Sequence, residues 1–175
     1  MKKRMLPLLL LACTTQAPAP AAADNVHFSG TLVAEPCTLP DADTDIRLDF
    51  GTVVTKYLYQ YQRTKSQPFA IHLQECDPAI MKTVSVTFQG TADTELPDLL
   101  ATDASGTAKG VAVGIERQDG TLLPVNKASP EMPLASGSTT LNFNAFVQIQ
   151  PTVLANTSLT EGSFTAISTF ILGYQ

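Results

Sequence analysis

Cysteine and histidine are the residue types of this chain with the most versatile chemistry, and they are few. The 175 residues include three cysteines, Cys13, Cys37 and Cys76, and two histidines, His27 and His72. Thiolates act as nucleophiles and metal ligands, so a thiol catalyst or a metal site at Cys37 and Cys76 is one interpretation. A metal site would need further ligands, and only the two histidines could add to the cysteines.

The histidines do not suggest a catalytic site. His72 alternates with the apolar residues Ile71 and Leu73, which predicts that its side chain lies on the outer face of a strand. His27 lies in an alternating segment near the N-terminus. No Ser–His–acid set can be placed around either of them, and no glycine-rich phosphate loop occurs. We therefore predict a protein that is not an enzyme, with no catalytic residue and no cofactor.

An acidic cluster could indicate a cation site instead. Asp41, Asp43 and Asp45 alternate within five residues. The stretch lacks the glycine and the downstream glutamate of a calcium-binding loop. We interpret it as a solvated acidic turn and expect no metal.

The N-terminus has the features of a signal peptide over residues 1–23. Three bases at Lys2, Lys3 and Arg4 precede an apolar run that ends at Ala12, and Ala21–Ala23 provides a cleavage site. The apolar run is too short to span a bilayer. Cleavage removes 3 of the 11 bases and none of the 16 acids, so 8 bases remain against 16 acids. This acidic balance disfavours nucleic acid and anionic membranes as partners.

A lipoprotein leader is an alternative interpretation. Leu10-Leu11-Ala12-Cys13 is similar to a bacterial lipoprotein cleavage box, and the ten residues from Cys13 to Ala22 are long for an ordinary cleavage region. Lipidation of Cys13 would make the protein a lipid-anchored module that binds a carbohydrate or a receptor. Cleavage near Ala23 would leave a secreted chain.

Export simplifies the interpretation of the other two cysteines. Cys37 and Cys76 are then the only pair in the mature chain, and paired cysteines in an exported protein indicate a disulfide. The bond would close a loop of about 40 residues and stabilise the fold by about 3–4 kcal/mol in the chain-entropy model.

The last fourteen residues, 162–175, form the clearest strand of the sequence. Aromatic and β-branched residues alternate, with Phe164, Phe170, Leu172 and Tyr174 on one side. Only Gln175 follows, so no later strand can pair with the free edge. An exposed apolar edge is normally covered, so we expect another polypeptide to cover this one.

Alternating runs elsewhere predict about eight short strands in one domain, with no helix longer than a turn or two. The runs lie at 24–34, 46–50, 69–76, 84–88, 111–115, 122–125 and 141–149. Residues 53–68 are the least regular, and their stripe of Tyr57, Tyr59 and Tyr61 predicts an edge strand or a loop, with a contact surface as the alternative.

These elements predict an all-β fold, an incomplete immunoglobulin-like β-sandwich that lacks its last strand. A sandwich that ends one strand early leaves a groove along Gly162–Tyr174. The N-terminal strand of another copy or relative could fill it by β-augmentation. The alternative is an ordinary monomeric sandwich that buries Val26, Phe28 and Leu32 in its own first strand.

Three segments resemble the structural subunits of chaperone–usher fimbriae, most of all the minor tip-fibrillum pilins of type 1 pili. The C-terminal segment has Gly162 fourteen residues from the end, Tyr174 in the penultimate position and alternating apolar residues between them. The segment Asp24–Gly30, followed by Val33 and Pro36-Cys37-Thr38, is similar to the donor segment and first cysteine of those pilins, and Cys76 matches the second cysteine. Ser168 and the long cleavage region depart from the family pattern.

The resemblance implies a mechanism of assembly. In this family the subunit lacks the seventh strand, a periplasmic chaperone lends one, and at an outer-membrane usher the N-terminal extension of the next subunit replaces it. The extension would be residues 24–34, and the pilin domain would be residues 35–175. Donor residues would be Val26, Phe28, Gly30 and Leu32, and the groove strand would contribute Gly162, Phe164, Phe170, Leu172 and Tyr174. The expected location is a fimbrium on the cell surface, and the expected role is that of a minor or tip subunit in adhesion.

Overall fold

The computed structural model describes residues 28–32 and 34–175. The predicted signal peptide, Cys13, Val26 and His27 lie outside the described residues. The chain divides into two units, Met1–Val33 and Ala34–Gln175, and each is considered by itself. In the first unit, residues 28–32 form neither helix nor strand.

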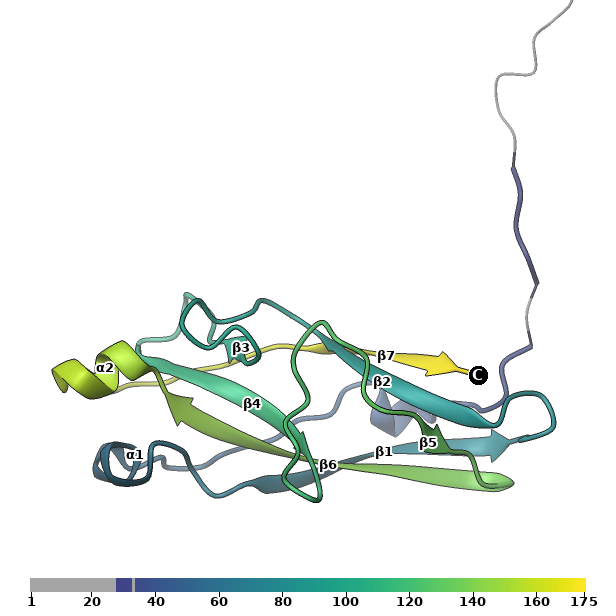
Figure 1. Ribbon diagram of the computed structural model, residues 1–175, viewed down its shortest axis with the longest axis horizontal. Helices are drawn as coiled ribbons and strands as arrows, with labels where there is room; N and C mark the ends of the chain where they lie inside the picture. The colour runs from purple at the N-terminus through teal and green to yellow at the C-terminus, as the bar shows by residue number, and fades with distance from the viewer. Residues whose placement is uncertain (1–27, 33) are drawn as a thin grey trace, which may run out of the picture. The chain divides into compact units, whose positions relative to one another are not determined.

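Two antiparallel sheets make up the second unit (Figure 1). The first sheet has the order β1-β6-β4-β3, formed by Gln67–Cys76, Gly137–Ile149, Val111–Arg117 and Leu100–Ala101. The second sheet has the order β5-β2-β7, formed by Met132–Pro133, Thr83–Gln89 and Thr169–Tyr174. The predicted all-β class with two sheets is confirmed.

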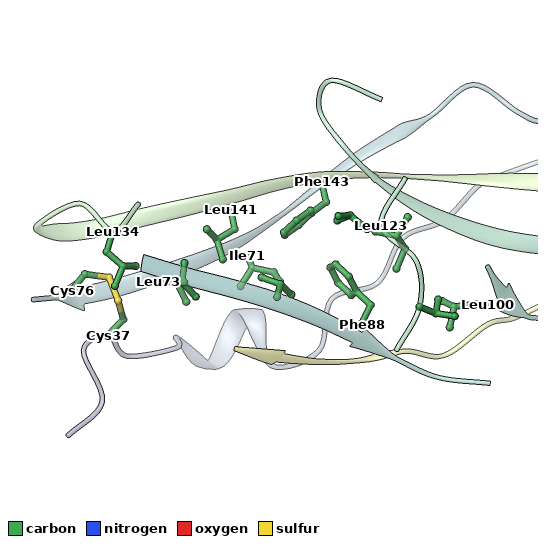
Figure 2. Packing of buried hydrophobic residues seen from close by; sticks show 14 of the residues in the cluster. Cys37, Ile71, Leu73, Cys76, Phe88, Leu100, Leu123, Leu134, Leu141 and Phe143 are labelled. Carbon is green, nitrogen blue, oxygen red and sulfur yellow. A yellow bond between two sulfur atoms is a disulfide. The ribbon is translucent and has the colours of Figure 1, made fainter. Parts of the chain in front are cut away.

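The core lies between the sheets and follows from the alternation of the strands. Three aromatic rings from different strands meet there: Phe69 on β1, Phe88 on β2 and Phe143 on β6, with centroids 5.2–6.0 Å apart. Figure 2 shows Leu141 and Ile71 beside this group, along the space between the sheets. Because side chains alternate across a strand, β1 and β2 each bury one row of side chains. In β4 residues 111–116 are buried on both faces, and in β6 the alternation gives way to a continuous buried stretch at residues 145–147.

Two short α-helices occur in the described part of the chain, one before β1 and one between β6 and β7. The second, α2 (Pro151–Asn156), starts with proline at the first turn, where no N–H is required. The first, α1 (Thr55–Tyr61), corrects the predicted edge strand or loop at the tyrosine stripe. Leu58 is its one buried side chain, and the rings of Tyr57 and Tyr61, one helical turn apart, contact each other in a tilted arrangement with centroids 4.5 Å apart. The alternation of tyrosines was therefore misleading, because the deciding residue was the leucine between them.

The burial of Asp43 also differs from the prediction. It belongs to a short 3-10 turn, Asp41–Asp43, and its side chain is buried, with 7% of the residue exposed. Its carboxylate accepts a hydrogen bond from the backbone N–H of His72 and lies 2.9 Å from Nδ1 of the same residue. The expectation of a wholly solvated acidic turn is wrong at this residue.

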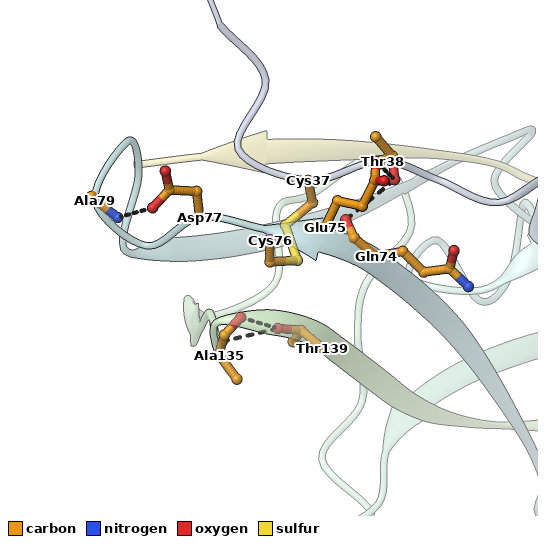
Figure 3. The surroundings of a disulfide bond; sticks show 9 residues. All are labelled: Cys37, Thr38, Gln74, Glu75, Cys76, Asp77, Ala79, Ala135 and Thr139. Atoms are coloured by element: carbon orange, nitrogen blue, oxygen red, sulfur yellow. Dashed lines mark hydrogen bonds between the residues drawn. A yellow bond between two sulfur atoms is a disulfide. The ribbon is translucent and has the colours of Figure 1, made fainter.

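The predicted disulfide between Cys37 and Cys76 is present (Figure 3). Both cysteines are buried at the end of β1. Next to the bond, Thr38 and Gln74 exchange two backbone hydrogen bonds of 2.8 and 2.9 Å. The disulfide therefore attaches the start of the second unit to β1 at a point where the backbones already pair.

Replacing both cysteines by serine should lower the free energy of unfolding by about 3–4 kcal/mol, because the unfolded chain gains the freedom of an open loop. Guanidinium unfolding followed by far-UV circular dichroism measures the change. Ser138→Ala, at an exposed position, controls for changes in stability that arise from expression and purification alone. A double variant as stable as the parent would contradict the prediction.

Candidate functional site

The C-terminal strand β7 has a partner on one side only. It pairs with β2 from Phe88–Phe170 to Val84–Tyr174, and it ends the sheet order β5-β2-β7. Within residues 28–32 and 34–175, no strand pairs with its other side. This open side is the free edge of the second sheet.

The backbone of β7 presents polar groups to that free edge. Thr83 and Gln175 exchange two hydrogen bonds, with N–O distances of 2.9 and 3.0 Å. Bonded and non-bonded pairs alternate along an antiparallel ladder, so the odd-numbered residues of β7 bond to β2. The N–H and C=O groups of Phe170, Leu172 and Tyr174 therefore point away from β2, and none has a backbone partner in the described part of the chain.

The free edge continues upstream of β7. The carbonyls of Ser163 and Thr165 accept hydrogen bonds from the N–H groups of Ala108 and Asp103 at 3.0 and 2.8 Å. The intervening Phe164 faces the other way, so its polar backbone groups join the free edge. The edge thus runs from residue 164 to residue 174.

The same residues carry the inward-facing side chains. Exposed and half-buried residues alternate from 163 to 175, and exposed Ile167 reaches 73%. We call the half-buried set the C-terminal row; it consists of Phe164, Ala166, Ser168, Phe170, Leu172 and Tyr174. Its apolar members pack against the buried core cluster. The predicted groove strand therefore combines apolar side chains that are partly uncovered with backbone groups that have no partner.

A second segment, residues 46–50, packs on the same core but, unlike β7, is paired with no strand among the described residues. Ile46 and Phe50 are half-buried against the core cluster, while Arg47 and Asp49 are exposed. The ring of Phe50 lies 6.2 Å from that of Phe164. Residues 46–50 were predicted as a strand, but no backbone pairing to them occurs in the described residues. Their alternation was read correctly, whereas their role beside the C-terminal row was missed.

Glycine is needed at position 162 because the backbone there passes very close to Thr107 and Ala108. Its φ is +151°, and a Cβ added there would lie 2.8 Å from the backbone nitrogen of Ala108 and closer still to Oγ1 of Thr107. The N–H of Ser163 donates to that same Oγ1 at 3.0 Å. Glycine is therefore required where the chain passes the 107–108 loop and enters the C-terminal row.

Two polar residues of the C-terminal row have defined environments. Burial raises the pKa of the Tyr174 phenol, and the charge of Glu35 adds to the rise, so the neutral phenol is favoured. Ser168 donates a hydrogen bond to the carbonyl of Gln89 at 3.0 Å. The departure from the family pattern at Ser168 is thus satisfied internally.

The predicted donor residues lie in the first unit, as far as they are described. Phe28 and Leu32 are 94% and 101% exposed, and nothing lies within 4 Å of a Cβ added at Gly30. Val26 lies outside the described residues. Their role as donors stays a prediction.

The chemistry available at the C-terminal row is that of strand recognition. Backbone N–H and C=O groups can bond an extended chain, and the half-buried apolar side chains can receive alternate residues of that chain. Groups of three or more metal-ligating side chains do not occur among the residues that the structure describes. No helix in the described ranges has the length and apolar character needed to cross a bilayer.

A family model described as "Fimbrial protein" matches residues 26–175. The chain belongs to this family. The fimbrial subunit is 30% identical over 170 residues to PmfF of Proteus mirabilis, which is named as a minor fimbrial subunit, with 96% of this chain and 93% of PmfF covered. It is 32% identical over 180 residues to the "Major MR/P fimbria protein" of the same organism, with both chains covered completely.

Solved structures give the same assignment. The fimbrial subunit matches the P pilus rod subunit PapA with a TM-score of 0.70 and 27% identity, over 81% of this chain and 100% of PapA. It matches a subunit from the structure of a chaperone–usher pilus with a TM-score of 0.69 and 26% identity, over 91% of this chain and 100% of the other. The protein is thus a structural subunit of chaperone–usher fimbriae, which are cell-surface fibres, and it associates there with other pilin subunits.

Replacing Gly162 by alanine should destabilise the fimbrial subunit by about 1–3 kcal/mol, because the added methyl group overlaps Thr107 and the backbone of residue 108. Thermal unfolding of the purified protein measures this. Gly173→Ala in the same segment is the matched control, since its Cβ would meet only Oγ of Ser85 at 3.0 Å. Equal losses in the two variants would contradict the explanation.

Proposed function

We propose that the fimbrial subunit assembles by donor-strand exchange, and that the C-terminal row is the acceptor. The observation that carries the proposal is the coincidence, in the same residues, of unpaired backbone groups and half-buried apolar side chains. A single extended strand placed beside residues 164–174 satisfies both needs at once. Few other ligands would bond to a whole row of backbone groups.

The proposed partners act in sequence. A periplasmic chaperone covers the C-terminal row first, because an uncovered apolar edge in the periplasm would aggregate. At an outer-membrane usher, the N-terminal extension of the next subunit then replaces the chaperone strand. The protein is a building block in this scheme and performs no catalysis.

The donor in the scheme is residues 24–34 of each copy. Exposed Phe28 and Leu32 supply apolar anchors, each contributing about 1.5–3 kcal/mol when buried. Gly30 lets the donor backbone approach the acceptor closely where the receiving surface is shallow.

We further propose a minor or tip-adaptor position in the fibre, where the subunit contributes to adhesion. The similarity of residues 24–38 to tip-fibrillum pilins and the similarity to PmfF support this position. Quantitative mass spectrometry of isolated fimbriae tests it, since a minor subunit is present in far fewer copies than the rod subunit.

Phe28→Asp should reduce incorporation of the subunit into fimbriae at least about tenfold, because it replaces an apolar anchor by a charge, and each 1.4 kcal/mol is a factor of ten. Blotting of sheared fimbriae against periplasmic extract measures it. Ser29→Asp is the matched control, since neighbouring residues of a strand face opposite sides. Normal incorporation of the Phe28 variant would reject residues 24–34 as the donor.

Tyr174→Ser should act one step earlier and lower the amount of periplasmic chaperone complex, because it removes a half-buried ring from the C-terminal row. Copurification of the subunit with a tagged chaperone measures capture. Ile171→Ser, on the opposite and more exposed face of β7, is the control. Undiminished capture of the Tyr174 variant, or an equal loss in the control, would contradict the acceptor assignment.

A further inference from the structure

The outer edge of β1 is the side of the strand that does not pair with β6, and the chain segment that leads to residues 46–50 bonds to part of it. Gln74 exchanges both of its backbone hydrogen bonds with Thr38. Strand residues alternate in the direction of their backbone groups, so the N–H groups of His72 and Ala70 point to the same outer edge. The next backbone partner for His72 would be the carbonyl of Pro40.

Pro40 does not fill that position. Its carbonyl accepts the N–H of Asp43 at 2.9 Å and closes the 3-10 turn instead. The carboxylate of Asp43 takes over and accepts the N–H of His72. Its oxygens also lie 2.9 and 3.3 Å from Nδ1 of the His72 ring. A buried side chain therefore stands in for the strand carbonyl that is missing.

Among the described residues, this contact is the last hydrogen bond between the segment that precedes β1 and β1 itself. Beyond it, Ala70 has no hydrogen-bond partner for its N–H among the described residues. Residues 46–50 do not return to β1 and pack on the core beside the C-terminal row instead, where Phe50 meets Phe164. Asp43 lies at the point where the chain leaves the first sheet.

We propose that Asp43 is a positioning residue for strand uptake: through His72 it fixes where residues 44–50 cross to the free edge, and so sets the far border of the acceptor. This inference rests on the proposed donor-strand function. An incoming strand needs two borders, and only the C-terminal row is held by a ladder of its own. The border formed by residues 46–50 has no ladder, so its position depends on the point where it is tied down.

The test uses the full-length protein, refolded with a fluorescein-labelled synthetic peptide of residues 24–34, and measures release of the peptide after excess unlabelled peptide is added. Asp43→Ala should release the peptide about tenfold faster, a change of about 1.4 kcal/mol. Asp43→Asn should stay within about twofold of the parent, because its amide oxygen can still accept the N–H of His72. Asp45→Ala is the matched control, since Asp45 is exposed and forms an ion pair with exposed Arg47.

Amide hydrogen exchange separates positioning from a general loss of structure. In Asp43→Ala the His72 amide should exchange at least about tenfold faster, while the Ile71 amide, which bonds to β6, should be unchanged. A fall in protection at both amides, or peptide release equal to that of Asp45→Ala, would overturn the proposal.

If Asp43→Ala does not fold, amide hydrogen exchange in the parent protein still tests the proposal. With the peptide bound, the His72 amide should exchange at least about tenfold more slowly than the Ala70 amide, and equal rates would overturn the proposal. The donor-strand function fails separately, when the parent binds the peptide no better than a peptide with Phe28→Asp. That result overturns both inferences. If the parent binds the peptide normally and Asp43→Ala releases it at the parent's rate, only the role of Asp43 is overturned.

Discussion

The constraint on which this structure depends is the free edge of its second sheet. In a strand, the residues that face the core on one side of the sheet direct their backbone groups to one edge. In β7 these residues are Phe170, Leu172 and Tyr174 of the C-terminal row, and no strand among the described residues pairs with that edge. Partly uncovered apolar side chains and unpaired backbone groups therefore occur at the same residues of the described chain. In the proposed donor-strand exchange, an extended polypeptide strand supplies both kinds of contact in one step.

The rest of the domain is arranged around this edge without closing it. The three-ring group of Phe69, Phe88 and Phe143 joins the two sheets, with Phe88 and Phe143 buried and Phe69 half-buried against them. Toward the free edge, burial falls from complete to partial. Gly162 lets the chain pass close to the 107–108 loop where it enters the C-terminal row. A side chain at this position would force the chain away from that loop.

The sequence predicted those features that depend on alternation and on cysteine pairing. The alternating runs predicted the positions of β1, β2, β4 and β6 and the buried rows of β1 and β2, and the pair Cys37 and Cys76 predicted the disulfide. What the sequence could not supply were features decided by tertiary contacts. The helix α1 forms because Leu58 finds a buried site against Val147 and Ile149, and no local pattern reports that site. Asp43 is buried because an amide 29 residues away needs an acceptor.

For the functional site, the sequence located the C-terminal strand and its inward-facing residues, since that information is carried by the strand itself. It did not reveal that residues 46–50 lie beside that row, where Phe50 contacts Phe164. Their alternation predicts a strand, but pairing is a property of two segments, and here the partner is absent from the described chain. The donor residues Val26, Phe28, Gly30 and Leu32 remain a prediction.

The disulfide has a mechanical consequence. Cys37 lies three residues into the second unit, and its bond leads directly to the end of β1, which is paired with β6 from Gln67 to Cys76. A pull on the preceding residues is therefore transmitted across sulfur into the longest ladder of the molecule, where the hydrogen bonds share the load. The loop between Cys37 and β1, with its 3-10 turn and helix α1, is bypassed and can keep its shape under tension.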